Sequence, residues 1–176
     1  SGQKLQMEIE PEWQGKPLVL GQQLPSERVD GLSISRVDGL LSQLALQRAD
    51  GSWLESEQWH VYLSAQKHLL SATADGLPAQ EFKAIRFRVG VDAKTDASDP
   101  QVWPPEHPLH PDVCGLHWGW SSGYVFLAIE GHWENHAGEG VPLILFGWPD
   151  MQAETTRWKL EVPRAGSLLL THSWDG

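Results

Sequence analysis

The sequence predicts an all-β fold, an antiparallel β-sandwich. Many short segments alternate apolar and polar residues or are rich in β-branched and aromatic residues, and Gly, Asp and Pro separate them at intervals of about eight to twelve residues. A length of 176 residues with 40% apolar and 20% charged content is typical of a globular protein with its own core. We therefore expect one domain over residues 1–176, with Ser1 and Gly2 as the remnant of a cleaved tag.

The clearest strand signals come from four segments of the chain. Residues 82–91 alternate with period two, and residues 40–48 precede Asp50-Gly51, which is a strong hairpin signal. Residues 59–63 and 124–129 are favoured as strands by their β-branched and aromatic content. Shorter strands are expected at residues 7–9, 17–20, 32–37, 141–146, 157–162 and 168–171.

Helical signals are weak. The apolar spacing of residues 33–46 also fits a helix, but Asp38-Gly39 interrupts it and Val37 is β-branched. We expect at most a short helical turn within residues 64–72.

Residues 92–122 are the exception to the strand pattern. This stretch has little periodicity and contains five prolines, and loops of this length in compact domains are usually functional or disordered. Its tryptophans and histidines indicate that it is packed. The sandwich therefore has one long, ordered and functional loop excursion over about residues 92–122.

Histidines concentrate in and just after this excursion. Five of the eight histidines lie between residues 107 and 136, in irregular chain beside large aromatic residues. Imidazoles in such surroundings are what a protein-bound transition metal requires, although each histidine taken singly also fits a hydrogen-bonded or solvated loop residue. His132 and His136 flank Trp133 in what we expect to be a polar turn, where surface residues are typical.

Other chemistries are less favoured. The lone Cys114 excludes an internal disulfide and fits either a soft Cu(I) ligand or a small buried hydrophobe. Carboxylates at 92–99 suit a hard cation but lack the glycine and terminal glutamate of an EF-hand loop. The G-x-S-x-G pattern at 119–123 enters from a loop and leaves into a strand, opposite to what a hydrolase elbow requires.

The net charge and the hydropathy pattern argue against nucleic acid and membranes as partners. A net charge of −10 disfavours nucleic acid and anionic membranes, because both attract cationic surfaces. The chain contains no run of eighteen apolar residues, so we expect no membrane span.

Four segments resemble the copper-binding MbnP-like family in order and spacing. They are L-S-Q-L-A-L at 41–46, F-K-A-I-R-F-R-V-G-V-D at 82–92, A-S-D-P at 97–100, and G-L-H-W-G-W-S-S-G-Y-V-F-L-A-I-E-G at 115–131. The resemblance covers roughly residues 17–162. It implies a mainly β protein that is periplasmic or extracellular after removal of a signal peptide, and that is associated with methanobactin systems. It also implies a dihaem cytochrome peroxidase-like protein as partner.

Some members of that family bind copper through two histidines and a tryptophan oxidised to kynurenine. The resemblance therefore implies a non-catalytic copper-binding protein. The dry, aromatic shell expected around its site favours Cu(I) over Cu(II). The first candidate ligand is His117, shielded by Trp118 and Trp120, followed by His107 and His110 of the same loop and by His60 from a neighbouring strand. The candidate tryptophans for modification are Trp118, Trp120 and Trp59, because each borders a candidate histidine in the sequence.

Two features of the chain depart from the family pattern. No histidine lies in the strand near Phe146, and no tryptophan stands two residues before a histidine, since Trp59 directly precedes His60. The alternative hypothesis is therefore a metal-free structural or partner-binding β domain that keeps the family fold without the copper site.

Overall fold

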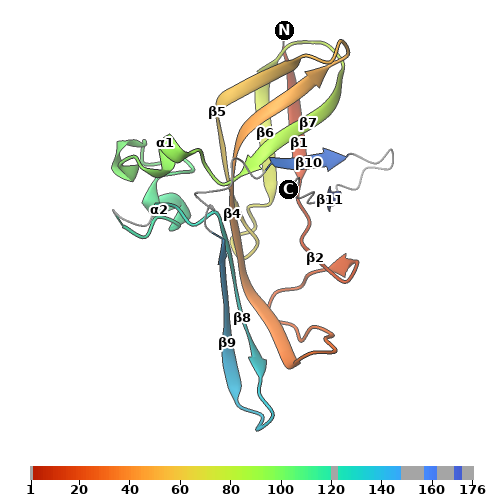
Figure 1. Ribbon diagram of the computed structural model, residues 1–176, viewed down its shortest axis with the longest axis vertical. Helices are drawn as coiled ribbons and strands as arrows, with labels where there is room; N and C mark the ends of the chain where they lie inside the picture. The colour runs from red at the N-terminus through yellow and green to blue at the C-terminus, as the bar shows by residue number, and fades with distance from the viewer. Residues whose placement is uncertain (1, 120–122, 148–156, 162–168, 172–176) are drawn as a thin grey trace.

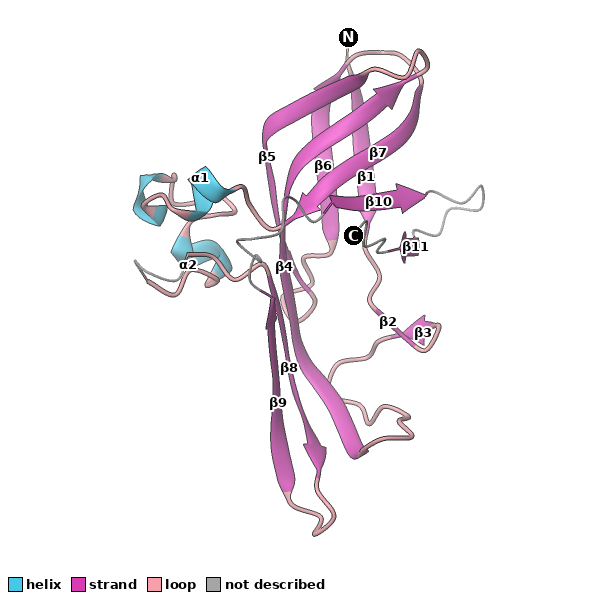
Figure 2. Ribbon diagram, in the orientation of Figure 1, coloured by secondary structure: helices cyan, strands magenta, loops and turns pink. Residues whose placement is uncertain are grey.

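The protein is an all-β antiparallel sandwich, as the sequence predicts (Figures 1 and 2). The computed structural model describes residues 2–119, 123–147, 157–161 and 169–171. Its strands are β1 (Gln3–Glu8), β2 (Glu12–Trp13), β3 (Lys16–Pro17), β4 (Asp30–Arg48), β5 (Trp53–Ser64), β6 (Ser71–Leu77), β7 (Phe82–Val89), β8 (Leu127–Glu134), β9 (Gly140–Gly147), β10 (Arg157–Glu161) and β11 (Leu169–Thr171). All the strand pairs are antiparallel.

Strand β4 organises the main sheet because it changes its partner along one edge. Residues 30–39 pair with β8, residues 41–48 pair with β7 on the same edge, and residues 38–47 pair with β5 on the other edge. The change occurs at the fully buried Leu40, whose N–H donates to the Phe126 carbonyl and whose carbonyl accepts from Gly90. Strands β7 and β8 diverge here, and the chain between them leaves the sheet at this point (Figure 1).

The turn out of β7 requires a glycine. Gly90 has a φ of 101°, and a Cβ atom at this position would lie 2.1 Å from the Phe126 ring. Both the left-handed backbone and the close approach exclude a side chain here.

The upper half of the main sheet packs on a second sheet formed by β1 and β6 (Figure 1). The core between them contains Met7, Leu41, Leu44, Leu46, Trp59, Ala72, Ala74, Leu77, Ile85 and Phe87. The hairpin between β4 and β5 turns at Asp50-Gly51, where Gly51 has a φ of 91°. The predicted hairpin signal is therefore confirmed.

The lower half of β4 continues into an arm with β8 and β9 (Figure 2). A smaller apolar cluster covers one face of this arm, formed by Leu24, Leu32 and Ile34 with partly buried neighbours that include Trp13 and Trp133.

The excursion between β7 and β8 is ordered over its described residues, as predicted. It contains α1 (Ala93–Asp96), the 3₁₀ turn η1 (Pro100–Val102) and α2 (Pro111–Cys114), while residues 120–122 lie outside the described chain. Its own core contains Leu40, Tyr62, Val91, Leu109, Cys114, Leu116, Tyr124, Val125, Phe126 and Ala128. Tyr124 is fully buried at its centre and donates a hydrogen bond of 2.6 Å to the Leu109 carbonyl. The excursion is thus a packed layer on the sheet.

The structure corrects several sequence-based expectations about individual elements. The segments at 32–37 and 40–48 form one strand that runs through Asp38-Gly39, so the interruption expected there is wrong, and the disfavoured helix over 33–46 does not form. The interruption does not occur because the buried Asp38 carboxylate is paired with Arg36 and accepts hydrogen bonds from Gln66 and Tyr62. A buried charge satisfied in this way fits inside a strand.

Element boundaries also differ from those predicted. Residues 65–68 form hydrogen-bonded turns with no helix, and residues 18–20 lie outside the short strand β3. The strand expected from residue 124 begins at Leu127, because Tyr124 makes only an isolated bridge to His117. His132 lies within β8 rather than in a turn. No helix in the described parts of the chain is long and apolar enough to cross a membrane.

Candidate metal centre

Three aromatic side chains, one from β5 and two from the excursion, meet where the excursion packs on the sheet. The rings of Trp103 and His107 are stacked, with centroids 4.2 Å apart and an interplanar angle of 15°. The His60 ring lies edge-on to both, with centroids 5.4 Å from Trp103 and 5.3 Å from His107. We call these three residues the His60–Trp103–His107 cluster.

The sheet register brings His60 to the cluster. His60 lies in β5 opposite Ser42 of β4, and Tyr62 lies opposite Leu40, so these four residues share one sheet face. Tyr62 and Leu40 belong to the excursion core, which shows that this face is the one that the excursion covers. Trp59, one residue earlier, is buried in the other core.

Local turns of the excursion position the other two rings. Asp99 caps η1 by accepting the N–H of Gln101, and the 3₁₀ turn ends at Trp103. His107 follows in the next turn, where its Nδ1 accepts the N–H of Leu109 at 3.1 Å. Leu109 is fully buried, so this bond ties the ring to the core of the excursion.

Partial burial favours the neutral form of both imidazoles of the cluster. Loss of solvent lowers the pKa of His60, although the backbone of Gln58 and the charge of Asp92 partly oppose this. Loss of solvent also lowers the pKa of His107, and repulsion from His60 lowers it further. Neutral imidazole is the form that binds a metal.

Two nitrogen atoms of the cluster are buried with unmet hydrogen-bonding capacity. They are Nδ1 of His60 and Nε1 of Trp103. Burial raises the pKa of the Tyr124 hydroxyl, and the nearby Trp103 indole N–H lowers it by a smaller amount. The geometry between the Trp103 indole N–H and the Tyr124 hydroxyl nevertheless falls short of a hydrogen bond. A buried polar atom without a partner costs free energy, and such atoms in native proteins call for an explanation such as a ligand.

The donor set of the cluster fits a soft, low-coordinate metal. Two imidazoles that share one metal ion have ring centroids about 5–6 Å apart, because each metal–nitrogen bond is about 2.0 Å long. The observed 5.3 Å between His60 and His107 lies in this range. Among the described residues, no three His, Cys, Asp or Glu side chains converge.

The other predicted ligands are engaged locally. His110 is buried at the N-cap of α2, where its Nδ1 accepts the N–H of Asp112 at 3.1 Å. The Nδ1 of His117 accepts the N–H of Gly119 at 3.3 Å, and its ring lies edge-on to Tyr124 with centroids 4.8 Å apart. The structure thus brings together His60 and His107 of the four predicted ligands, and places His110 and His117 in local contacts.

Of the three predicted tryptophans, Trp59 is buried on the other side of the sheet, Trp118 is at the surface and Trp120 lies outside the described chain. The indole of Trp59 donates to the Thr73 carbonyl at 2.8 Å within the core between the sheets. Trp118 is 48% exposed at the surface, and Trp120 is not described. Cys114 is buried in the excursion core, where loss of solvent raises the pKa of its thiol, which disfavours the thiolate that metals require.

Sequence reasoning missed Trp103. The available signal was the spacing W-P-P-E-H over residues 103–107, in which two prolines stiffen the chain between an indole and an imidazole. A search for a tryptophan two residues before a histidine, or directly beside one, does not find Trp103, which stands four residues before His107.

Comparisons with known proteins agree with the fold. Residues 2–167 match the sequence profile of the MbnP family. The structure is similar to that of MbnP from Methylosinus trichosporium, with a TM-score of 0.59 and 15% sequence identity over 97% of this chain and 68% of that one. No curated protein sequence matches the chain.

Proposed function

The chain belongs to the MbnP family, and on that premise we propose that it is a non-catalytic, periplasmic or extracellular copper-binding protein. The observation that carries the proposal is the meeting of His60 with the stacked rings of Trp103 and His107, in which both half-buried imidazoles have a lowered pKa. A half-buried, aromatic surrounding with two nitrogen donors favours Cu(I) over Cu(II).

Trp103 is the residue proposed to complete the site. Oxidation of its indole to kynurenine cleaves the C2–C3 bond, adds an oxygen to each carbon, and releases C2 as formate on hydrolysis. It thereby replaces a ring N–H, which cannot bind a metal, by an aryl amine and a ketone, which can. The indole nitrogen is already buried without a full partner beside both imidazoles. Within the described chain no carboxylate or thiolate competes for the third position. We assign this oxidation to the dihaem cytochrome peroxidase-like partner that the family resemblance implies.

The local hydrogen bond of His107 sets a cost for binding. Its Nδ1 accepts the Leu109 N–H, so a metal bound at the other ring nitrogen requires the proton to move to Nδ1. That tautomer loses the bond to Leu109, at a cost of about 1 kcal/mol. His60 has no such cost at its unpartnered Nδ1.

The test is a competition titration against a Cu(I) chelator with paired variants. We expect His60→Ala and His107→Ala each to weaken copper binding by at least about 100-fold, because losing a ligand exceeds the effect of losing an outer-shell partner. His110→Ala and His117→Ala are the matched controls, and we expect less than a threefold change. Equal losses in all four variants, or none in the first two, would contradict the proposed site.

The pH dependence of binding provides a second measurement. Burial lowers the pKa of both histidines, so protons compete with copper only below the ordinary imidazole range of about 6.5. We expect the affinity to be nearly constant from about pH 7.5 to 6.5 and to fall at lower pH. A steep loss that begins above pH 7 points to exposed ligands.

Peptide mapping of protein from its native source tests the modification. We expect the tryptic peptide that contains Trp103 to carry the mass of kynurenine, one oxygen gained and one carbon lost. Protein made in a host without the haem partner serves as the unmodified control. Modification at Trp118 or Trp59 instead would place the site elsewhere. A chain with unmodified tryptophan and no bound copper is the metal-free domain of the alternative hypothesis.

A further inference from the structure

A cleft opens between the main sheet and the second sheet of the sandwich, at the edge formed by β5 and β6. It has a volume of about 320 Å³. Strands β4 and β5 form one wall, and the end of β6 with the residue that follows it forms the other. The lining residues are Leu44, Leu46, Leu54, Glu55, Ser56, Asp75, Gly76, Leu77 and Pro78. The copper proposal uses none of them.

The cleft forms because β5 and β6 belong to different sheets and do not pair with each other. Within the described chain, β5 pairs with no strand but β4, and β6 with none but β1. The indole N–H of Trp59 bridges the two strands by donating to the Thr73 carbonyl at 2.8 Å. No hydrogen bond joins the described residues 54–56 to residues 75–78, so the edge stays open beyond that bridge.

A bulge at the end of β6 keeps this edge irregular. One residue separates Gln3 from Leu5 on β1, whereas two residues separate their partners Leu77 and Ala74 on β6. Gly76 lies in this longer stretch with a φ of 67°, a left-handed conformation that glycine adopts without strain. A Cβ atom at Gly76 would meet nothing within 4 Å, which shows that the space in front of it is open.

The interior of the cleft is apolar apart from one hydroxyl group. Ser56 lies opposite Leu44 in the pairing of β5 with β4, and Leu54 lies opposite Leu46, so these four side chains share the inner face of the sheet. Leu77 from β6 belongs to the same core. Ser56 is half-buried, and its hydroxyl makes no hydrogen bond with a described residue. A small side chain at this point of a leucine-lined wall leaves space that an alkyl chain fits.

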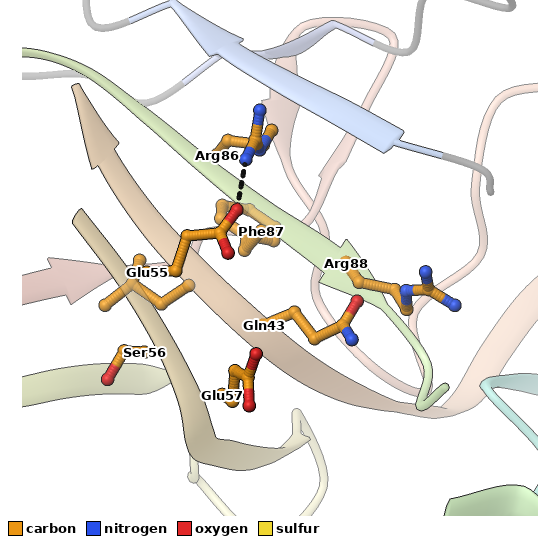
Figure 3. A pocket seen from close by; sticks show the side chains of 8 residues that line it. Gln43, Glu55, Ser56, Glu57, Arg86, Phe87 and Arg88 are labelled. Carbon is orange, nitrogen blue, oxygen red and sulfur yellow. Dashed lines mark hydrogen bonds and ion pairs between the residues drawn. The ribbon is translucent and has the colours of Figure 1, made fainter. Parts of the chain in front are cut away.

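The charged residues of the cleft are acidic, and one carboxylate is free. Glu55 projects from the opposite face of β5 and is paired with Arg86 at 3.0 Å, whereas Ser56 lies on the other side of the β5 ribbon (Figure 3). Asp75 is exposed at the rim and makes no ion pair or hydrogen bond with any described residue. None of the lining residues is basic. The cleft therefore combines an apolar interior with a single available negative charge.

We propose that this cleft binds a primary alkylammonium ion with a chain of about six carbons. The chain lies between the leucines in the space beside Ser56, and the ammonium group contacts the Asp75 carboxylate. A ligand with a carboxylate head would face Asp75 with no cation to neutralise it. The volume lies at the lower end of the range of about 300–1,000 Å³ that is typical of ligand pockets. The cleft is open and the ion pair is solvated, so the affinity is on the order of 1 mM.

The test is a titration of the full chain, labelled with ¹⁵N, by hexylammonium and by two analogues at neutral pH. Hexanoate keeps the chain and reverses the charge, whereas ethylammonium keeps the charge and lacks most of the chain. We expect saturable shifts of the Leu54, Ser56 and Leu77 amides with hexylammonium. Either analogue should bind at least about tenfold more weakly, since each half-buried CH₂ group contributes about twofold to affinity. No saturable shift at about 10 mM hexylammonium, or less than tenfold discrimination against either analogue, overturns the proposal.

Two variants and one control connect binding to the cleft. Asp75→Asn removes the free carboxylate and should weaken hexylammonium binding about threefold or more. The control Glu57→Gln removes the same charge from the groove on the opposite face of β5 and should leave binding unchanged (Figure 3). Ser56→Val fills part of the cleft, so we expect at least about tenfold weaker binding with an unchanged or higher urea midpoint of unfolding.

Three outcomes of the variant series would contradict the assignment. They are unchanged hexylammonium binding in Asp75→Asn or Ser56→Val, equal weakening in Glu57→Gln, and a lower urea midpoint in Ser56→Val. The last would mean that the space beside Ser56 is too small for added carbon atoms.

Discussion

His107 and His110 lie three residues apart and make the same local contact, yet their surroundings differ. Each Nδ1 accepts the backbone N–H two residues further on, from Leu109 and from Asp112 respectively, at 3.1 Å in both cases. His107 also stacks on Trp103 and faces His60, which comes from a distant strand. His110 caps α2 next to an exposed aspartate. The local sequence thus orients both rings, and only a long-range partner turns one of them into a candidate ligand.

Leu109, between the two histidines in sequence, anchors the loop to the excursion core, so its truncation has the largest expected effect. The side chain is fully buried, its N–H binds His107, and its carbonyl accepts the Tyr124 hydroxyl. We expect Leu109→Ala to lower the free energy of unfolding by about 3 kcal/mol, measured by urea denaturation. The half-exposed Leu69→Ala is the control, with a cost below about 1 kcal/mol. A cost for Leu109→Ala equal to that control would show that the excursion is not packed as described.

Tyr124→Phe tests the hydrogen bond between the Tyr124 hydroxyl and the Leu109 carbonyl without creating a cavity. It removes the donor to the Leu109 carbonyl and leaves that buried oxygen without a partner. We expect a loss of about 1–2 kcal/mol in the free energy of unfolding. If His107 depends on this anchor, copper binding should also weaken in the variant. A variant as stable as the wild type would indicate that the Leu109 carbonyl finds another donor.

The pH dependence of stability isolates the His60–Trp103–His107 cluster. Burial lowers the pKa of His60 and His107, so below about pH 6.5 the unfolded chain binds more protons than the folded one. Their contribution is therefore present above that pH and is lost as the pH falls toward the lowered folded-state values. We expect His60→Leu to lose less stability than the wild type between about pH 7.5 and 5.5, measured by urea denaturation.

The control for this measurement is Tyr124→Phe, which alters stability but keeps both histidines. It should show the same loss on acidification as the wild type. An equal loss in His60→Leu would place the titrating groups outside the cluster.

Asp112→Ala probes the surroundings of His110 and has the smallest expected effect on stability and copper binding. Its carboxylate lies 3.8 Å from the His110 ring nitrogen and is almost fully exposed, and it stands in the first turn of α2. Exposed ion pairs and helix-end charges of this kind contribute about 0.5 kcal/mol or less. Thermal or urea unfolding should change by no more than this, and copper affinity should not change. A large effect on either would show that His110 and its neighbour belong to the metal centre after all.

Local residue patterns were sufficient to predict the fold class and several of its parts. The alternation in 82–91 predicted β7, Asp50-Gly51 predicted the hairpin, and the family segments predicted membership confirmed over residues 2–167. The proline-rich stretch from 92 was predicted to be ordered, and its aromatic and apolar residues form a core of their own. These features depend on contacts between neighbours in sequence or on composition, which a single chain displays directly.

The candidate site depended on tertiary structure. His60 meets Trp103 and His107 because β4 exchanges β8 for β7 at Leu40, and the excursion that leaves there folds back over the face of β5. Proximity in sequence favoured His117 and its flanking tryptophans instead. Similarly, Gln43 showed no unusual signal until the register shifts on both edges of β4 gave it a positive φ. Sequence determines which side chains are available, whereas strand register and crossover decide which of them meet.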